Sequence, residues 1–269
     1  MNQPGYDAEL FASLHQRGDP LLLANAWDVA SAVAIASAGA KAIATTSAGV
    51  AWSLGVPDGA DLGADRAAAV IRRITAAVPV PVSADIEAGY GHSPEAVAAT
   101  VAAVAGAGAV GVNIEDRRDS SLFEPGQQAE RLAAARAATD GIPVWINART
   151  DVFLTGAYST TSAGVAAALR RAAVYAEAGA DSLFVPGLTD LAAIADLAAG
   201  PLPVAVMVWP GAPTVAQLTA AGVVRISLGS AIAQAAYGLA ERAATELFTT
   251  GTYDSSSAGI SYTAMNDAL

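Results

Sequence analysis

The chain has 269 residues, of which 54% are hydrophobic and 14% are charged, and its formal net charge is −11. The acidic balance and the lack of a basic patch argue against a nucleic-acid partner. No uncharged apolar run reaches the roughly 18 residues that predict a membrane span, and the N-terminus lacks the basic start and apolar core of a signal peptide. We therefore expect a soluble, cytoplasmic protein.

The residues that are absent narrow the chemistry. There is no cysteine, which excludes disulfides, a thiolate nucleophile and a zinc–thiolate site. Lys41 is the only lysine, and it precedes a predicted strand, which is a poor position for Schiff-base chemistry. Of the two histidines, His15 lies in an N-terminal helical stretch and is expected at the surface. The chemistry must therefore depend on carboxylates, arginine, hydroxyls and backbone amides, with or without a metal.

Short apolar runs alternate with alanine-rich amphipathic stretches along the chain. After an N-terminal helix over about 7–16, each apolar run is expected to be a strand and each amphipathic stretch a helix. The expected strands are 21–27, 42–47, 80–86, 110–115, 144–150, 182–185, 204–208 and 224–228. The helices are expected to begin near Asp28, Asp61, Ser93, Gln127, Thr161, Thr189, Thr214 and Ser230.

This strict alternation, with strands that read as apolar on both faces, predicts a parallel (β/α)₈ TIM-type barrel preceded by an N-terminal helix. A doubly wound open sheet is the alternative, but no GxGxxG fingerprint follows the first strand. We expect one barrel domain over 1–249. The remainder, 250–269, is rich in Ser, Thr and Gly and is expected to be a mobile arm or a segment ordered by a neighbour.

Polar residues gather where the predicted strands end, which is where the active site of such a barrel lies. Asp85 and Glu87 are two residues apart, so in a strand their side chains would leave the same face. Their mutual repulsion calls for a positive charge between them. The strand-end residues are Asn25–Asp28, Thr45–Gly49, Asp85, Glu87, Asn113, Glu115, Asp116, Asn147, Arg149 and Asp151.

These residues suggest a site for a small 2-oxo acid. Asp85, Glu87 and Glu115 can surround a divalent ion such as Mg²⁺, directly or through waters. Arg149, the only cation among the strand-end residues, suits a carboxylate or a phosphonate. The amides near Thr46, Ser47 and Ala48 can hold another substrate oxygen. The ion would polarise the keto oxygen and stabilise an enolate.

The sequence resembles the isocitrate lyase/phosphoenolpyruvate mutase superfamily. The matching motifs are Asn-Ala-Trp-Asp from Asn25, Thr-Thr-Ser-Ala-Gly-Val from Thr45, Leu-Gly-Val-Pro-Asp from Leu54, Asp-Ile-Glu-Ala-Gly-Tyr-Gly from Asp85, Gly-Val-Asn-Ile-Glu-Asp from Gly111 and Asn-Ala-Arg-Thr-Asp from Asn147. The resemblance implies a barrel whose last helix is swapped between subunits of a homo-oligomer, a dimer or a dimer of dimers (homotetramer). It also implies Mg²⁺ or Mn²⁺ and a 2-oxo acid substrate.

Carried over by position, the resemblance makes Asp85 the principal metal ligand, with Glu87 and Glu115 acting mostly through waters. It places Asp58 on a gating loop as a catalytic residue. Arg149 binds the anionic end of the substrate, and the turn of Thr46, Ser47 and Ala48 binds its carboxylate. Trp27 is expected to shape the wall of the substrate pocket.

Departures from the superfamily patterns bear on the reaction. Its carbon–carbon lyases carry a Lys-Lys/Arg-Cys-Gly-His loop with a cysteine acid, but the corresponding loop here, 116–125, has no cysteine, lysine or histidine. It also lacks the Lys-Thr-Asn-Ser type stretch of the mutase branch. Ala44 or Thr45 stands where that branch has tryptophan, and Pro186 where a mutase has histidine.

The leading interpretation is a Mg²⁺-dependent lyase or decarboxylase that makes or breaks a C–C bond through a metal-stabilised enolate. The alternative is a P–C bond mutase or hydrolase, in which Arg117 or Arg118 with Ser120 and Ser121 would contact a phosphonate. A third hypothesis is a non-catalytic 2-oxo acid binding protein.

Two residues of the turn after Glu87 are further candidates for a role in the active site. His92 is expected to neighbour a helix N-cap, with a proton donor near the metal as the alternative. Tyr90 either closes over the substrate or packs.

Overall fold

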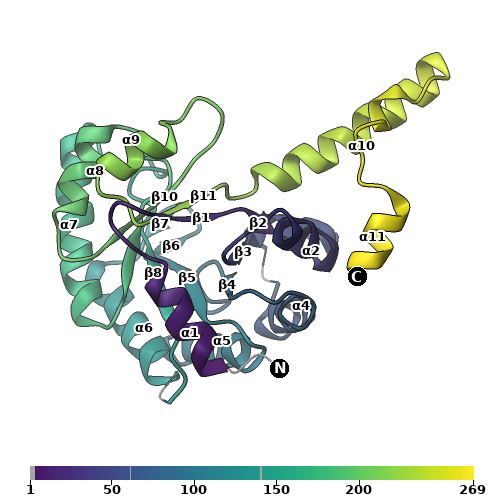
Figure 1. The fold of residues 1–269 in the computed structure, drawn as a ribbon. Helices are drawn as coiled ribbons and strands as arrows, with labels where there is room; N and C mark the ends of the chain where they lie inside the picture. Colours follow the sequence, from purple (N-terminus) through teal and green to yellow (C-terminus); the bar gives the residue numbers. More distant parts are fainter. Residues whose placement is uncertain (1–3, 61, 140) are drawn as a thin grey trace.

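The computed structural model describes residues 4–60, 62–139 and 141–269, and its central feature is a parallel barrel (Figure 1). The strands of the barrel are β1 (Leu21–Leu23), β2 (Asn25–Ala26), β3 (Ile43–Thr45), β4 (Val82–Asp85), β5 (Gly111–Glu115), β8 (Trp145–Arg149), β9 (Ser182–Phe184), β10 (Val204–Met207) and β11 (Arg225–Ser227). All the strand pairs of this sheet are parallel. The predicted barrel is confirmed, and each expected strand is present with slightly narrower bounds.

The barrel closes at its first strand, which is broken at Ala24 into two halves. β1 pairs with β11 and β2 pairs with β3. Asn25 bridges this seam: its side chain donates to the Thr45 carbonyl at 3.1 Å and accepts from the Leu228 amide at 3.0 Å. An asparagine amide can do this because it carries both a donor and an acceptor.

The helices lie outside the barrel strands (Figure 1). They are α1 (Pro4–Ser13), α2 (Val29–Ser37), α3 (Ser47–Ser53), α4 (Ala64–Ala77), α5 (Pro94–Gly106), α6 (Pro125–Ala137), α7 (Thr161–Glu177), α8 (Leu191–Ala198), α9 (Val215–Ala220), α10 (Ala231–Thr250) and α11 (Tyr262–Ala268). Asp28, Ser93 and Thr214 are N-caps whose side chains accept a backbone N–H, as their residue types predict. Asp61 lies outside the described residues.

Five short elements were not expected from the sequence. The first is α3, which begins at Ser47 because the strand predicted over 42–47 ends at Thr45. The loop after β5 contains two more, the strands of an antiparallel hairpin, β6 (Arg117–Arg118) and β7 (Ser121–Leu122). The other two are a 3₁₀ helix, Asp254–Ser256, and α11.

Several strands are not apolar on both faces, so that expectation was wrong for them, whereas β10 meets it with Val204, Ala205 and Val206 all buried. One face of each strand packs into the shell between barrel and helices, where Ala84, Val112 and Ile146 belong to a single buried cluster. The alternating positions fill the barrel interior with buried polar side chains, namely Ser83, Asn113, Asn147, Ser182 and Arg225. Their hydrogen bonds to one another compensate for the water they lose, which makes a polar interior tolerable.

Helix α1 plugs the end of the barrel opposite the strand carboxyl ends. Phe11 is fully buried, and its ring would lie 2.7 Å from a Cβ placed on Gly111, so only glycine fits there. The His15 ring stacks on Trp145 with centroids 4.1 Å apart. The prediction of a surface His15 was therefore wrong: burial and then the Arg225 charge lower its pKa to about 3.

The C-terminal part leaves the barrel. Helix α10 projects away from it, and the chain then returns through α11 (Figure 1), which contacts α2. The Glu246 carboxylate of α10 accepts from the amides of Asp254 and Ser255, which lie in the segment between α10 and α11, at 2.8 Å each. No helix within the described residues is long and apolar enough to span a membrane.

Asn25→Ala tests the seam. The substitution removes one partner each from the Thr45 carbonyl and the Leu228 amide, so we expect the free energy of unfolding to fall by about 1–2 kcal/mol in urea denaturation. Thr249→Ala, which removes only a bond to the Thr245 carbonyl on exposed α10, is the matched control and is expected to change it by less than about 0.5 kcal/mol. Equal losses would contradict the role of Asn25.

Candidate active site

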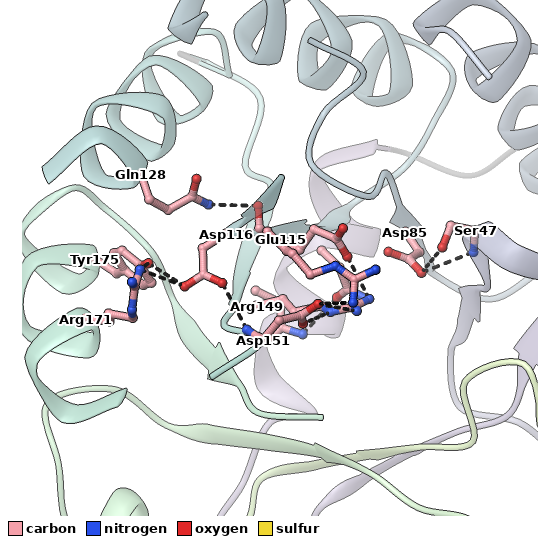
Figure 2. A network of polar contacts seen from close by, with 12 residues as sticks. Ser47, Asp85, Glu115, Asp116, Gln128, Arg149, Asp151, Arg171 and Tyr175 are labelled. Carbon is pink, nitrogen blue, oxygen red and sulfur yellow. Dashed lines mark hydrogen bonds and ion pairs between the residues drawn. The ribbon is translucent and has the colours of Figure 1, made fainter. Parts of the chain in front are cut away.

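Three of the predicted site residues, Asp85, Glu115 and Arg149, come together at the carboxyl ends of β4, β5 and β8 (Figure 2). Asp85, the last residue of β4, accepts from the Ser47 amide at 3.1 Å and from the Ser47 hydroxyl at 2.9 Å, both on Oδ2. Its own amide donates to Thr45 Oγ1 at 2.9 Å. The start of α3 thus holds one oxygen of Asp85 and leaves Oδ1 for another partner.

Glu87 lies beyond β4 and not within it. Its φ of +51° places it in the left-handed region, so the argument that it shares a strand face with Asp85 was wrong. The neighbouring backbone is held in place by Arg131, a fully buried residue of α6 that donates to the Ala88 carbonyl and, at 3.3 Å, to the Gly91 carbonyl. A strained backbone persists only where its surroundings hold it.

Arg149 lies between two carboxylates (Figure 2). Nη1 is 2.9 Å from Glu115 Oε2, while Nε and Nη2 contact the two oxygens of Asp151 at 2.6 and 2.9 Å. The bidentate pair with Asp151 fixes the plane of the guanidinium. Three of its five N–H groups are used, which leaves two for a ligand.

A second group of buried residues forms hydrogen bonds that fix the positions of Asp151 and of the end of β5 (Figure 2). Asp116 accepts from the Asp151 amide at 2.9 Å, from Tyr175 at 2.8 Å and from Arg171 at 3.1 Å. Gln128 of α6 donates to the Glu115 carbonyl at 3.3 Å. The helices α6 and α7 therefore position the ends of β5 and β8.

Crowding and burial change the protonation of the carboxylates. Burial raises the pKa of Glu87 to about 8, and the charges of Asp85, Asp58 and Glu115 add to the rise. Burial likewise raises the pKa of Glu115 to about 7, although Arg149 opposes it. For Arg149, burial alone would lower the pKa, but Glu115 and Asp151 outweigh it and the net shift is upward. Without a cation, the site therefore holds protons near neutral pH.

A cavity of about 320 Å³ opens beside these carboxylates. Glu87, Glu115, Tyr90, His92 and Arg117 are among the residues that line it. Arg117 is also 3.6 Å from Asp151. His92, which directly precedes the N-cap Ser93 as expected, therefore also faces the cavity.

Asp58 lies on the loop after α3, where the charged residues at the strand ends (the rim of the barrel) shift its pKa. Burial raises its pKa and the Asp85 carboxylate raises it further, while Arg149 and Arg117 oppose the rise. Asp58 is thus electrostatically coupled to the charged residues at the strand ends, the site near which the sequence resemblance places it.

The residues present fit a hard divalent cation. All the donors are carboxylate oxygens, which Mg²⁺ and Mn²⁺ prefer. Glu87 Oε1 is buried and has no hydrogen-bond partner among the described residues, which is costly for a carboxylate unless a cation or water serves it. Within the described part of the chain, no three His, Cys, Asp or Glu side chains are close enough to hold an ion by themselves. A cation here would take Asp85 and waters, with the glutamates one water away.

The turn after β3 differs in detail from its predicted role. The Thr46 amide donates to the Ala26 carbonyl at 3.0 Å, and the Ser47 amide is bound to Asp85, so neither is free for a substrate carboxylate. Ala48 follows within the first turn of α3. The Trp27 ring lies 6.3 Å from that of Tyr237 on α10, centroid to centroid, which places it beside the C-terminal helix.

Sequence reasoning missed Arg131, Arg171, Tyr175 and Gln128. In the sequence they are ordinary helix residues, and only the presence of long polar side chains on the buried face of an amphipathic helix signals them. Arg225 was also missed, although an arginine within the apolar run Val-Val-Arg-Ile is a visible signal.

Comparison with known proteins gives consistent matches. A family model described as phosphoenolpyruvate phosphomutase matches residues 11–248. An uncharacterized protein of Mycobacterium tuberculosis is 40% identical over 223 residues, covering 82% of this chain and 81% of that protein. The 2-methylisocitrate lyase of Salmonella typhimurium is 33% identical over 201 residues, covering 71% of this chain and 65% of the enzyme. A crystal structure of a provisionally assigned phosphonomutase from Burkholderia cenocepacia has a TM-score of 0.85 at 42% identity, covering 93% of this chain and all of that one.

The raised pKa values predict how stability depends on pH without metal. In the folded protein, Glu87 and Glu115 release their protons only near pH 8 and 7, whereas in the unfolded chain they do so near 4.3. The stability they contribute is therefore fully present below about pH 4.3, falls as the pH rises above that value and is lost above pH 8. In chelator, we expect the free energy of unfolding to fall between about pH 5 and 8, by an amount on the order of a few kcal/mol, and to level off at higher pH.

The control for this titration is Glu130→Gln on the exposed face of α6, which is expected to keep the wild-type pH slope, while Glu87→Gln flattens it. Saturating Mg²⁺ should also reduce the fall, because a cation stabilises the ionised carboxylates. A slope unchanged in Glu87→Gln would contradict the assignment.

Proposed function

Because the chain belongs to the phosphoenolpyruvate phosphomutase family, within the isocitrate lyase/phosphoenolpyruvate mutase superfamily, we propose that it is a Mg²⁺- or Mn²⁺-dependent enzyme acting on a small 2-oxo acid. The reaction we propose is the cleavage or formation of a C–C bond, as in a lyase or decarboxylase. The observation that carries it is the group of carboxylates in which Glu87 Oε1 has no hydrogen-bond partner among the described residues, placed beside an arginine that keeps two N–H groups for an anion.

Asp85 would hold the cation through Oδ1, since Oδ2 is bound to Ser47. Glu87 and Glu115 would act through waters. When bound, the cation would supply the Lewis acidity that polarises the keto group of the substrate. Ser47 keeps the Asp85 carboxylate in one orientation, which matters because a ligand displaced by about 1 Å binds poorly.

Arg149 would bind the carboxylate of the substrate with its two remaining N–H groups. Its clamp between Glu115 and Asp151 means that little side-chain entropy is lost on binding. Asp58, on the loop after α3, would approach the same site from the solvent side. Since the chain has no cysteine, the proton returned to carbon would come from water in this proposal.

A P–C bond mutase or hydrolase is the second candidate. Arg117 supports it, because its side chain is 41% exposed and lines the cavity next to Glu87, where it could contact a phosphonate. Ser120 and Ser121 lie on the same hairpin segment. The side chain of Arg118, the other arginine suggested for this role, lies outside what the structure describes.

A panel assay with Mg²⁺ tests the function. Oxaloacetate, dimethylmalate, methylisocitrate and phosphonopyruvate would be supplied in turn, and the release of pyruvate or phosphate measured. We expect pyruvate release from a carbon substrate that chelator abolishes, and that Asp85→Ala lowers by at least about 10³-fold, the loss typical of a directly acting group. Asp196→Ala, an exposed acid on α8, is the matched control and should retain activity.

The other outcomes distinguish the alternatives. Phosphate release from phosphonopyruvate, without pyruvate from the carbon acids, would favour the second candidate. No turnover of any compound, with 2-oxo acid binding intact, would contradict an enzymatic role and support a non-catalytic binding protein.

We also propose that α10 is exchanged between two copies of the chain, as the sequence resemblance implies. Only Ala233 of this helix is buried, and Leu239, Leu247 and Phe248 are exposed. A groove of about 670 Å³ at the barrel seam, lined by Leu22, Ile35 and Val215 among others, offers an apolar surface to a partner.

Light scattering tests this assembly. The wild type is expected to have at least twice the mass of one chain, and four times if dimers pair. Leu247→Glu should shift the population toward monomer, because it places a charge in an apolar contact. Glu241→Gln on the same helix is the control. A monomeric wild type would rule out the exchange.

A further inference from the structure

Arg225 is a cation buried inside the barrel, and no carboxylate of the described residues pairs with it. It is the first residue of β11 and is 2% exposed. Nη2 donates to Asn113 Oδ1 at 3.1 Å and lies 3.5 Å from Ser83 Oγ, while Nη1 is buried with no hydrogen-bond partner among the described residues. Nor does any carboxylate of the described chain form an ion pair with it.

A buried charge of this kind is expensive unless another charge compensates for it. The end of the barrel plugged by α1 offers none, because His15 is neutral there and Phe11 presents only its ring, 5.9 Å from the guanidinium. The carboxylates lie at the other end. Burial lowers the pKa of Arg225 to about 10, and the attraction that opposes this comes from Asp85.

The sheet register shows how Arg225 reaches that end. Asn113, which accepts its hydrogen bond, is the register partner of Asp85 on β4. Asn113 Oδ1 also accepts from Asn147 Nδ2 at 2.8 Å, so two donors fix the orientation of this amide. The guanidinium is therefore held in the polar layer next to the residue proposed to bind the cation.

We propose that Arg225 is a positioning residue whose buried charge lies beneath the rim carboxylates, where it weakens their hold on the divalent cation and strengthens the binding of the anionic substrate. This inference rests on the proposed function. A fixed positive charge inside a poorly solvated barrel repels a cation and attracts an anion over several ångströms, because little water screens it.

The experiment uses two probes and two variants of the full chain. Mn²⁺ binding without substrate would be followed by electron paramagnetic resonance, and oxalate binding at saturating Mg²⁺ by calorimetry. Arg225→Gln removes the charge but keeps a hydrogen-bonding side chain, and Arg225→Lys keeps the charge. For Arg225→Gln we expect Mn²⁺ affinity to rise about tenfold and oxalate affinity to fall about tenfold, whereas Arg225→Lys should stay within about threefold of wild type for both.

A charge effect changes the Mn²⁺ affinity and the oxalate affinity in opposite directions, whereas a purely structural role of Arg225 would weaken both. If Arg225→Gln leaves Mn²⁺ affinity unchanged, or weakens both probes together, the proposal is overturned. If Arg225→Gln does not fold, Arg225→Lys decides: retained binding of both probes supports the charge, and loss of binding or of folding overturns the proposal by showing that guanidinium contacts are what the site needs.

Failure of the proposed function would look different. Wild-type protein that binds no Mn²⁺, or binds it equally well as Asp85→Ala, would contradict the cation site itself. Mn²⁺ binding that depends on Asp85 but not on Arg225 would overturn only the inference about Arg225.

Discussion

Holding several carboxylates together in a partly buried space is the constraint on which the rest of this structure depends. Asp85, Glu87, Glu115 and Asp151 converge at one end of the barrel, where their negative charges repel one another. Arg149 offsets part of this charge by contacting Glu115 and Asp151 at once. The raised pKa values of Glu87 and Glu115 show that the compensation is incomplete. The remaining deficit of positive charge is what a divalent cation would fill.

The geometry of this rim is set by residues that do not belong to it. Arg131 holds the backbone beyond Glu87, and Asp116 holds the amide of Asp151 while Arg171 and Tyr175 hold Asp116. These groups are buried and form hydrogen bonds to backbone groups or to each other, so they can fix the positions of the strand ends. Precision at the strand ends therefore comes from the inward faces of α6 and α7.

The sequence was sufficient to predict the barrel and the identity of most rim residues. Strand–helix alternation locates β4, β5 and β8, and once they are parallel neighbours their carboxyl ends must meet, which brings Asp85, Glu115 and Arg149 together. The superfamily resemblance of the motifs from Asn25 to Asp151 is confirmed by the family match. Glu87 shows the limit: its left-handed backbone is followed by carbonyls that accept from Arg131 of α6, and its own carbonyl accepts from the Glu115 amide, and local periodicity carries no information about such contacts.

The polar interior was unpredictable for a related reason. Single serines and asparagines within apolar strands carry no period of their own, and whether they face helices or the barrel axis depends on closure of the sheet. Asn25 contributes to this closure, because its amide ties β3 to the residue after β11. Once the barrel is closed, Ser83, Asn113, Asn147 and Arg225 form hydrogen bonds with one another and with Ser182, and no carboxylate of the described residues forms an ion pair with Arg225. Its nearest compensation is the acidic rim, so the interior and the candidate site form one electrostatic unit, and a substitution deep in the barrel changes the balance between cation and anion at its mouth.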